Sequence, residues 1–334
     1  MNIVIVGATG NVGRKILEVI EKLNFQFSEL YLIASDKSVG KKIIFKSKTY
    51  SVIGLSDFDF AKVKIAFFSA GSAIAEKWAP IAAKKTIVID NSKHFRMDKE
   101  IPLVVPEVNA EAIKLYKNKN IIANANCSTI QLVLVLKPLH DQFKIKRVIV
   151  STYQSVSGAG QNHMTELEEQ SKLVLEKQKV NSKNFTKQIA FNVIPHIDSF
   201  MEDGYTKEEW KMTVETKKIL DLNIKLSATC VRVPVFVGHS ESVNIEFESD
   251  VNVKKVRKCL EKASGCKVVD DTKDGGYITP AESSGDFTTY ISRIREDKTR
   301  KNSMNMWVVS DNLLKGAALN AVQIANVLIK KYIN

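Results

Sequence analysis

The 334-residue chain has no apolar run that approaches the ~20 residues of a membrane-spanning helix. Residues 2–6 form an apolar segment that lacks the basic region and the cleavage site of an export signal. The four cysteines form no Cys-x-x-Cys pair, and the five histidines show no metal-ligand spacing with them. We therefore expect no membrane association, no export and no metal site, and these expectations favour a protein of the reducing cytoplasm.

The chain also lacks a recognisable nucleic-acid-binding motif, although its formal net charge is +12. Its lysines are spread along the whole length. They are densest in residues 41–48, where they alternate with apolar residues in a pattern typical of a solvated hairpin. We expect no nucleic-acid partner, because the positive balance suits anionic small molecules equally well. Apolar residues make up 44% of the chain and charged residues 26%, which is ordinary for a globular protein, and the length favours about two domains.

Strand and helix patterns alternate along the first part of the chain. Apolar strands separated by helices are typical of a parallel sheet that is covered on both faces. We predict strands at 2–6, 29–34, 64–69, 86–90, 101–105 and 120–124, helices at 11–23, 72–84 and 109–117, and a hairpin at 42–53. The predicted fold class is therefore α/β, with a Rossmann-like parallel-sheet domain at the N-terminus.

The pattern changes after residue 127, where the predicted strands become longer. The short link at Gly238 between two adjacent strands indicates an antiparallel sheet, and hence an α+β second domain. An amphipathic helix at 311–332 could return to complete the first domain. The predicted strands are 145–156, 225–237 and 239–249, the helices about 160–179 and 206–220, and the domains 1–126 with 311–334, and 127–310.

Three glycines join the first predicted strand to the first predicted helix, in Gly7-Ala-Thr-Gly10-Asn-Val-Gly13. Glycine lets the backbone turn tightly and approach a pyrophosphate, whose charge then faces the helix N-terminus. The strand, loop and helix context predicts a dinucleotide-binding domain.

The second strand ends in Ser35-Asp36-Lys37-Ser38, where the adenosine ribose would lie. An acid there favours the free 2′-hydroxyl of NAD, whereas a cation with serines favours the 2′-phosphate of NADP. Adjacent residues of an extended chain point to opposite sides, so an inward Lys37 would turn Asp36 outward. We expect an NADP preference on this argument, although the residue types alone leave both cofactors open.

Cys127 stands apart from the other cysteines because it lies between a short buried strand and the predicted buried helix 128–137. Asn126 is suited to cap that helix. The free N–H groups and positive dipole end of a helix N-terminus favour a thiolate, and they could hold the oxyanion of a carbonyl under attack. The position indicates acyl or carbonyl chemistry, with a buried structural cysteine as the alternative.

Two ionisable residues, His239 and Glu241, begin a strand face that is otherwise apolar, and Arg232 lies on the apolar face of the preceding strand. Each alone is more often structural, but Arg and His facing one cleft could hold a substrate carboxylate and move a proton. Glu215 and Lys218 project from one helix face, as a surface ion pair would.

Arg96 follows the end of a predicted strand of the first domain. It would therefore lie at the carboxyl edge of the sheet, where ligands bind in such folds.

Taken together, these residues resemble the aspartate-β-semialdehyde dehydrogenase family along essentially the whole chain. The Asn-Cys-Ser-Thr segment, followed by Arg-Val-Pro-Val and Gly-His-Ser-Glu, is specific, whereas the glycine loop is shared by many families. The resembling segments are 7–13, 95–98, 102–109, 124–131, 153–160, 215–218, 227–235, 238–241 and 311–325.

The resemblance implies that Cys127 is the acyl-enzyme nucleophile, that His239 is the acid/base and that Gln154 orients the acyl group. The implied substrate-binding residues are Arg232 for the carboxylate, Glu215 near the amino group, Arg96 and Lys218 for the phosphate, and Asn126 beside the nucleophile. The implied cofactor contacts are Gly7, Thr9, Gly10, Asn11, Val12, Gly13, Ser35, Lys37, Ser38, Ser157, Gly158 and Asn312. Similar enzymes often carry Ala-Arg where this chain has Asp36-Lys37, and lysine meets a 2′-phosphate without the fork of arginine.

The resemblance implies an NADPH-dependent, reversible reduction of L-aspartyl-4-phosphate to the semialdehyde through a cysteine thioester, with a proton from His239. It also implies a place in the biosynthesis of lysine and diaminopimelate, threonine, methionine and isoleucine, and a homodimer that could pair again. One alternative is a reductase of N-acetyl-γ-glutamyl phosphate, which would not need Glu215 because its substrate carries no free ammonium. Another alternative is a non-catalytic NADP-binding sensor or scaffold, which would not need Cys127.

Overall fold

The computed structural model describes residues 1–333, which divide into two compact units. The first unit comprises Met1–Ala125 together with the chain from Ala317 onward, and the second comprises Asn126–Gly316. The sequence had suggested boundaries at 126 and 311. Among residues 1–333, no helix combines the length and the apolar character that crossing a membrane requires.

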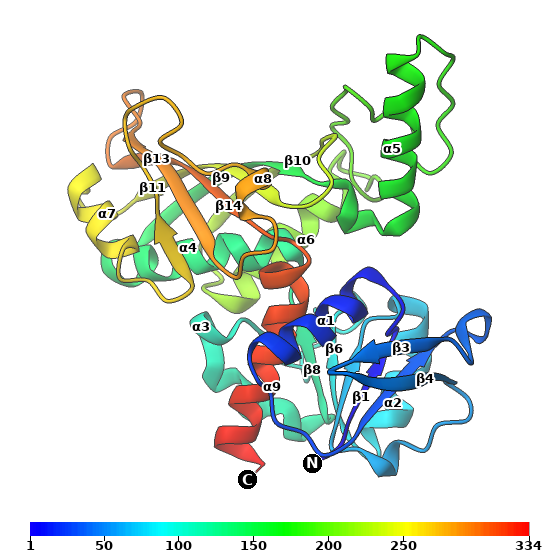
Figure 1. The fold of residues 1–334 in the computed structure, drawn as a ribbon. Coiled ribbons are helices and arrows are strands. Elements are labelled where there is room, and N and C mark those ends of the chain that lie inside the picture. Colours follow the sequence, from blue (N-terminus) through cyan, green and yellow to red (C-terminus); the bar gives the residue numbers. More distant parts are fainter. Residues whose placement is uncertain (334) are drawn as a thin grey trace. The chain divides into compact units, whose positions relative to one another are not determined.

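The first unit is built on an eight-stranded sheet in the order β3-β4-β2-β1-β5-β6-β8-β7 (Figure 1). All of its pairings are parallel except that of β3 with β4, so the predicted parallel sheet is confirmed. The central strands are buried along their whole length, as their apolar sequences require. The strands are β1 Ile3–Val6, β2 Leu30–Ala34, β3 Lys42–Phe45, β4 Lys48–Gly54, β5 Ile65–Phe68, β6 Ile87–Asp90, β7 Leu103–Val104 and β8 Ile121–Asn124.

The helices of the first unit include α1 (Asn11–Lys22) and α2 (Ser72–Ala83), both close to their predicted bounds. The predicted helix 109–117 is wrong in type, because α3 (Pro106–Asn109) continues as a 3₁₀ helix over Ala110–Asn118. The C-terminal helix α9 (Leu319–Tyr332) packs beside α1, but it begins later than predicted. A π-helical turn, Leu314–Ala318, precedes it, and two further 3₁₀ turns span Asp36–Ser38 and Phe60–Lys62.

The second unit contains a six-stranded sheet in the order β10-β9-β11-β14-β13-β12. The expected direct pairing of the strands that flank Gly238 is wrong, because β9 lies between β10 and β11 and pairs in parallel with β10. The sheet is therefore mixed rather than purely antiparallel, since β12 and β13 also run in parallel. The strands are β9 Ile145–Gln154, β10 Lys225–Arg232, β11 His239–Phe247, β12 Cys266–Val268, β13 Thr289–Glu296 and β14 Ser303–Ser310.

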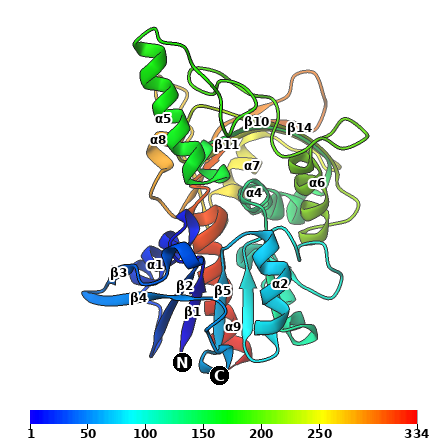
Figure 2. The ribbon, with the colours of Figure 1, turned by 90° about the vertical axis from the view of Figure 1, so that its right-hand side faces the viewer.

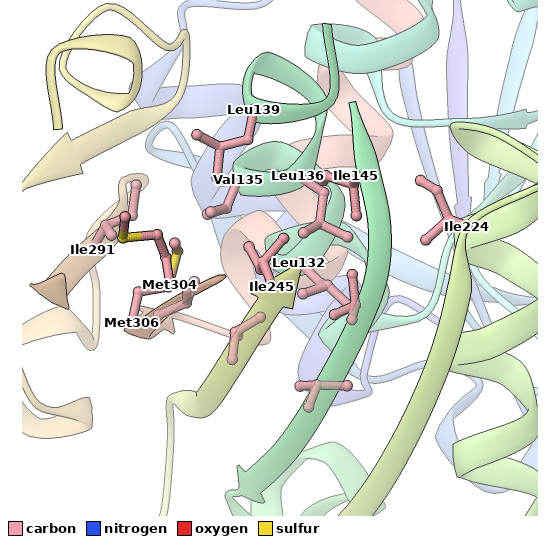
Figure 3. Close-up of a cluster of buried hydrophobic side chains, with 14 of the residues drawn as sticks. Leu132, Val135, Leu136, Leu139, Ile145, Ile224, Ile245, Ile291, Met304 and Met306 are labelled. Carbon is pink, nitrogen blue, oxygen red and sulfur yellow. The ribbon is translucent and has the colours of Figure 1, made fainter. Parts of the chain in front are cut away.

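Three helices cover one face of this second sheet, with α6 (Lys207–Ile219) against β10, α4 (Cys127–Phe143) against the central strands and α7 (Val253–Leu260) against β12 and β13. Figure 3 shows the core that they form, in which Leu132 and Leu136 of α4 meet the strand residues Ile245 and Met306. Burial of these side chains fixes α4 on the sheet. A further helix, α5 (Gln161–Leu175), follows the 3₁₀ turn Val156–Ala159, and α8 is the short Pro280–Ser283 helix (Figure 2).

Candidate active site

Cys127 is the first residue of α4, as the sequence predicted. The helix begins there because Oδ1 of Asn126 accepts hydrogen bonds from the backbone N–H groups of Ser128 (3.0 Å) and Thr129 (3.3 Å). A side chain on Gly316 would come within 2.9 Å of the Cys127 Cβ, so the chain needs glycine beside the thiol. The thiol is half-buried at the positive end of the helix dipole, an environment that favours a thiolate.

Two carboxylates of α6 hold Asn126. Its backbone N–H donates to Oε2 of Glu215 (2.6 Å), and its Nδ2 donates to Oε1 of Glu208 (2.9 Å). Glu215 is only 1% exposed, so the alternative of a surface ion pair is wrong for this residue. Lys218 lies one turn further along α6 and is half-buried.

The side chains of Arg232 and His239 lie close together in the second unit. Arg232 ends β10 and His239 begins β11. A Cβ atom on Gly158 would lie 3.2 Å from Nε2 of His239 and 3.4 Å from Nη1 of Arg232. The guanidinium is anchored where Nη1 donates to the carbonyl oxygen of Ser155 (2.6 Å). Burial lowers the pKa of Arg232, while the negative charges of Glu208 and Cys127 oppose that change. The thiolate form of Cys127 therefore has a cationic neighbour.

The imidazole of His239 is completely buried. Its Nδ1 accepts a hydrogen bond from the backbone N–H of Ser155 (3.0 Å), so the neutral ring carries its proton on Nε2. Within residues 1–333, Nε2 has no hydrogen-bond partner. Burial, assisted by the positive charge of Arg232, lowers the pKa of His239 to about 3. The ring is therefore a neutral hydrogen-bond donor at neutral pH.

Gln154, the last residue of β9, is buried beside this cluster. Its Nε2 donates to Oε1 of Glu208 (3.2 Å), and its Oε1 accepts from the hydroxyl of Thr152 (3.0 Å). The predicted residues Cys127, Asn126, Gln154, Glu215, Lys218, Arg232 and His239 thus belong to one unit, and all but Lys218 are connected by the contacts above. Such a set can present a thiolate, a cation and a neutral N–H donor to one substrate.

Arg96 belongs to the first unit, where it is 8% exposed. Its Nε donates to the carbonyl oxygen of Asn124 (2.9 Å) and its Nη2 to that of Asn91 (3.0 Å). These bonds hold the guanidinium at the carboxyl ends of β6 and β8, which is where the sequence had predicted it.

A cavity of about 480 Å³ lies at the glycine loop of the first unit. Gly7 has φ +90°, and a Cβ on it would lie 2.6 Å from the carbonyl oxygen of Ser69, so only glycine fits. A Cβ on Gly13 would lie 2.2 Å from the carbonyl oxygen of Gly7, which allows α1 to pack closely on the loop. The N-cap residue of α1 is Gly10, which has no side chain to cap the helix. The loop therefore suits an anionic pyrophosphate.

Ser35 and Asp36, which follow β2, line the cavity, whereas Lys37 is not among its lining residues. The premise that this segment is extended is wrong, because Asp36–Ser38 form a 3₁₀ turn. Asp36 and Lys37 therefore do not alternate simply between inside and outside. Of the other predicted cofactor residues, Gly7, Thr9 and Gly10 line the cavity, and Asn11, Val12 and Gly13 form the first turn of α1.

The remaining predicted cofactor residues lie in the second unit. Oδ1 of Asn312 accepts hydrogen bonds from the hydroxyls of Ser155 (3.0 Å) and Ser157 (3.3 Å) and from the backbone N–H of Gly238 (2.9 Å). Asn312 thus ties the loop that contains Gly158 to the start of β11.

Sequence reasoning missed Glu208, Ser155 and much of the cavity lining. Glu208 lies in the Glu-Glu pair at the start of α6, a pattern common at helix N-termini. Nothing in that pattern marks the first acid as buried. The lining residues Leu55, Ser56, Ser69, Ala70, Ile74 and Trp78 come from separate parts of the chain that only the sheet brings together.

Two family models match most of the chain. The model described as the NAD binding domain of semialdehyde dehydrogenase matches residues 2–116, and the one described as its dimerisation domain matches residues 136–315. A curated relative, the aspartate-semialdehyde dehydrogenase of Aquifex aeolicus, is 51% identical over 98% of this chain and 98% of its own.

Solved structures of aspartate-semialdehyde dehydrogenases are also similar to this chain. The crystal structure of aspartate semialdehyde dehydrogenase II from Vibrio cholerae has a TM-score of 0.97 and 47% identity over 99% of both chains, and that enzyme is also solved complexed with ASA. The Candida albicans enzyme, crystallised with NADP, has a TM-score of 0.76 and 26% identity over 100% of this chain and 99% of its own.

Proposed function

The chain belongs to the aspartate-semialdehyde dehydrogenase family, and we propose that it catalyses the reversible, NADPH-dependent conversion of L-aspartyl-4-phosphate to L-aspartate-4-semialdehyde and phosphate. The observation that carries the proposal is the capped N-terminus of α4, with Cys127 at its first position in the same unit as Arg232 and His239. The relatives' names support an oxidoreductase of amino-acid biosynthesis, and the lysine, threonine, methionine and isoleucine branches belong to the proposal.

In the reductive direction, the Cys127 thiolate attacks the acyl phosphate, a C–S bond forms and phosphate leaves. The resulting thioester accepts hydride more readily than a carboxylate would, so covalent catalysis divides a difficult reduction into two easier steps. The tetrahedral intermediate that hydride transfer creates then expels the thiolate and releases the aldehyde. Nε2–H of His239 and the positive dipole end of α4 can stabilise its oxyanion.

The charged groups of the proposed substrate each have an oppositely charged side chain among the site residues. Arg232 would bind the carboxylate as a bidentate partner, and Glu215 would attract the ammonium. Lys218 and Arg96 would hold the phosphate. A carboxylate on Arg232 would offset the positive charge that helps to lower the pKa of His239, so substrate binding would raise that pKa and prepare the ring for proton transfer.

The glycine loop, the uncapped start of α1 and the cavity of about 480 Å³ fit a dinucleotide. The bound cofactor supplies the hydride. We infer a preference for NADP because Ser35 lines the cavity, Lys37 follows it closely in the chain, and the Candida albicans relative was crystallised with NADP. A homodimer built on the second unit and a cytoplasmic location are also part of the proposal.

The closest competing enzyme would reduce N-acetyl-γ-glutamyl phosphate. Glu215 argues against it, because a buried carboxylate beside the nucleophile turn would face a neutral acetamide instead of an ammonium. A non-catalytic dinucleotide sensor would have no use for the capped cysteine.

Two measurements decide among these functions. We expect phosphate-dependent reduction of NADP⁺ by aspartate semialdehyde, with little activity on N-acetylglutamate semialdehyde. With aspartyl phosphate and no NADPH, mass spectrometry should find an acyl adduct on Cys127. Turnover without phosphate, activity only on the acetylated substrate, or a fully active Cys127→Ala variant would contradict the proposal.

A further inference from the structure

We propose that Glu208 is a positioning residue that fixes the amide orientations of Asn126 and Gln154, and through them the nucleophile turn and the acyl-binding amide. The inference rests on the proposed function, because it assumes that Cys127 and Gln154 act on the substrate. Neither the family resemblance nor the sequence pattern had drawn attention to Glu208.

The geometry rests on one carboxylate oxygen. Oε1 of Glu208 accepts hydrogen bonds from Nδ2 of Asn126 (2.9 Å) and from Nε2 of Gln154 (3.2 Å). A carboxylate only accepts hydrogen bonds, so both amides must turn their nitrogen toward it. Without such a partner, the two ends of an amide are nearly equivalent in shape and either orientation is accessible.

Each amide orientation has a consequence for the site. The oxygen of Asn126 is left to cap the N–H groups of Ser128 and Thr129, which starts α4 at Cys127. The oxygen of Gln154 is left to accept from Thr152, and the second N–H of its amide can point to a substrate acyl oxygen. If either amide turned over, a carbonyl oxygen would face another oxygen or the start of the helix would lose its cap.

The carboxylate is held in its charged form although it is 5% exposed. Burial opposes ionisation, but the charge of Lys211 and hydrogen bonds from Lys211, Asn126 and Gln154 outweigh it and lower the pKa of Glu208 to about 2. Oε2 of Glu208 forms a short ion pair with Lys211, whose Nζ also contacts Asp198 (3.1 Å). Lys211 thus occupies one oxygen of Glu208 and leaves the other for the two amides.

The neighbouring residue, Glu209, has a different set of contacts. It forms a capping box with Thr206, and its Oε1 accepts from the backbone N–H of Cys230 (2.9 Å). Glu209 therefore anchors α6 to β10, whereas Glu208 serves the nucleophile turn. The two adjacent, buried glutamates form a matched pair for substitution.

The test compares Glu208→Gln with Glu209→Gln. In Glu208→Gln the Lys211 ammonium should attract the new amide oxygen, so the new NH₂ group would face the two amides and repel their nitrogens. We expect kcat to fall at least about tenfold, the effect of losing one hydrogen bond to a charged group, with KM changed by less than about twofold. Alkylation of Cys127 by iodoacetamide in the substrate-free enzyme should slow in parallel.

Rescue supplies a second readout that a purely structural role would not produce. In the double variant Glu208→Gln with Lys211→Met, no cation competes for the amide oxygen, so it can again accept from Asn126 and Gln154. We expect kcat and the alkylation rate to recover at least partly. Glu209→Gln should lower the urea midpoint of unfolding while both rates stay within about twofold of the wild type.

Three results would overturn the inference: a Glu208→Gln variant with wild-type kcat, one whose kcat falls without rescue and in step with its urea midpoint, or one in which Cys127 is alkylated at the wild-type rate. Alkylation needs no substrate, so it reports on the nucleophile turn even if the reaction has been misassigned. Absence of the acyl adduct in the wild type would reject the proposed function, and absence of the alkylation effect would reject the role of Glu208.

Discussion

At the residue scale, the charge of a buried neighbour, Arg232, affects the pKa of His239. Burial lowers its pKa, the charge of Arg232 lowers it further, and the result is about 3. Because the folded pKa lies below the ordinary value of 6.5, protonation opposes folding, and stability falls as the pH drops from about 6.5 toward 3. Replacing Arg232 with an apolar residue of similar length separates the contribution of the guanidinium charge to this pKa from the contribution of burial.

We predict that Arg232→Met raises the pKa of His239, because it removes the Coulombic contribution and leaves the burial. NMR titration of ¹³C-labelled histidine would follow the ring carbons of His239 between pH 3 and 8. The Lys218→Met variant is the control, because it removes a different cation of the same unit and leaves the Arg232 charge, which lowers this pKa, in place. An unchanged titration in Arg232→Met would show that burial alone determines the pKa.

Asp36 and Lys37 give a second prediction at the residue scale. Asp36 lines the cavity at the end of β2, and the 3₁₀ turn removes the reason to expect it to point away. We now expect Asp36→Ala to increase the kcat/KM ratio of NADP⁺ over NAD⁺ by about threefold to tenfold, because it removes repulsion of a 2′-phosphate. Lys37→Ala should decrease that ratio.

Steady-state kinetics with both cofactors would measure the two ratios. A wild type that prefers NAD⁺, and loses this preference in Asp36→Ala, would show that Asp36 binds the ribose hydroxyls.

Local sequence identified some site residues and could not identify others. Cys127 was found because a strand, a capping residue and an apolar helix follow one another along the chain. His239 was found because a histidine interrupts an apolar strand face. Glu208 was missed because its burial is decided by Asn126 and Gln154, which are distant in sequence and reach it only through the packing of α6 beside α4.

At the scale of elements, α4 and β11 each bury a further polar residue beyond the active-site residues. Gln131 lies four residues after Cys127 on α4, and Glu241 lies two residues after His239 on β11, so each shares a face with a site residue. Both side chains are at most 1% exposed. Burial raises the pKa of Glu241 well above its ordinary value, and the Gln131 side chain offsets this only in part. Burial therefore favours the protonated, neutral form of this carboxyl in the folded protein.

This protonation gives stability a definite dependence on pH. The unfolded chain loses the Glu241 proton above about pH 4.5 while the folded chain keeps it, so the folded state loses stability as the pH rises toward the folded pKa. The loss is at most about 1.4 kcal/mol per pH unit. We predict that Glu241→Gln removes this dependence, so that the free energy of unfolding of the variant rises relative to that of the wild type as the pH increases from 5 to 8.

Urea unfolding at several pH values would measure the difference. Glu246→Gln on the same strand is the control, because Arg300 lowers the pKa of Glu246 and that carboxylate is ionised in both states over this range. A constant difference between wild type and Glu241→Gln from pH 5 to 8 would contradict a protonated Glu241.

Strand periodicity predicted most elements but not their neighbours in the sheet. The first unit was predictable because strands that alternate with helices pair in parallel with few alternatives. In the second unit, the short link at Gly238 predicts an antiparallel sheet in which the segments 225–237 and 239–249 are adjacent strands. The chain actually leaves the sheet after Arg232, and β9, which comes about 70 residues earlier, fills the gap.

At the scale of the molecule, α4, α6 and α7 all pack on one face of the second sheet, and Ser242 lies on the other face. The central strand β11 turns Glu241 and Val243 toward α4, so Ser242 points to the opposite face, where it is exposed. Its register neighbours are Ser151 on β9 and Trp307 on β14, and the Trp307 ring lies 5.4 Å from that of Tyr153. A face with small and aromatic residues is suited to an isologous contact with a second copy.

The match of residues 136–315 to a dimerisation domain supports such a contact. We therefore predict that the wild type is a dimer. Ser242→Arg should raise the Kd of this dimer by at least about a hundredfold. The arginine on the central strand of one subunit would collide with the same arginine of the other, and two like charges would be brought together. The monomer should fold normally, since Ser242 is exposed.

Leu222→Arg is the matched control, because Leu222 is 77% exposed in the turn after α6 and away from this face. Sedimentation velocity over a range of concentrations would measure both variants. If Leu222→Arg dissociated the dimer and Ser242→Arg did not, the subunit contact would lie on the side of α6 and the open face of the sheet would have another use.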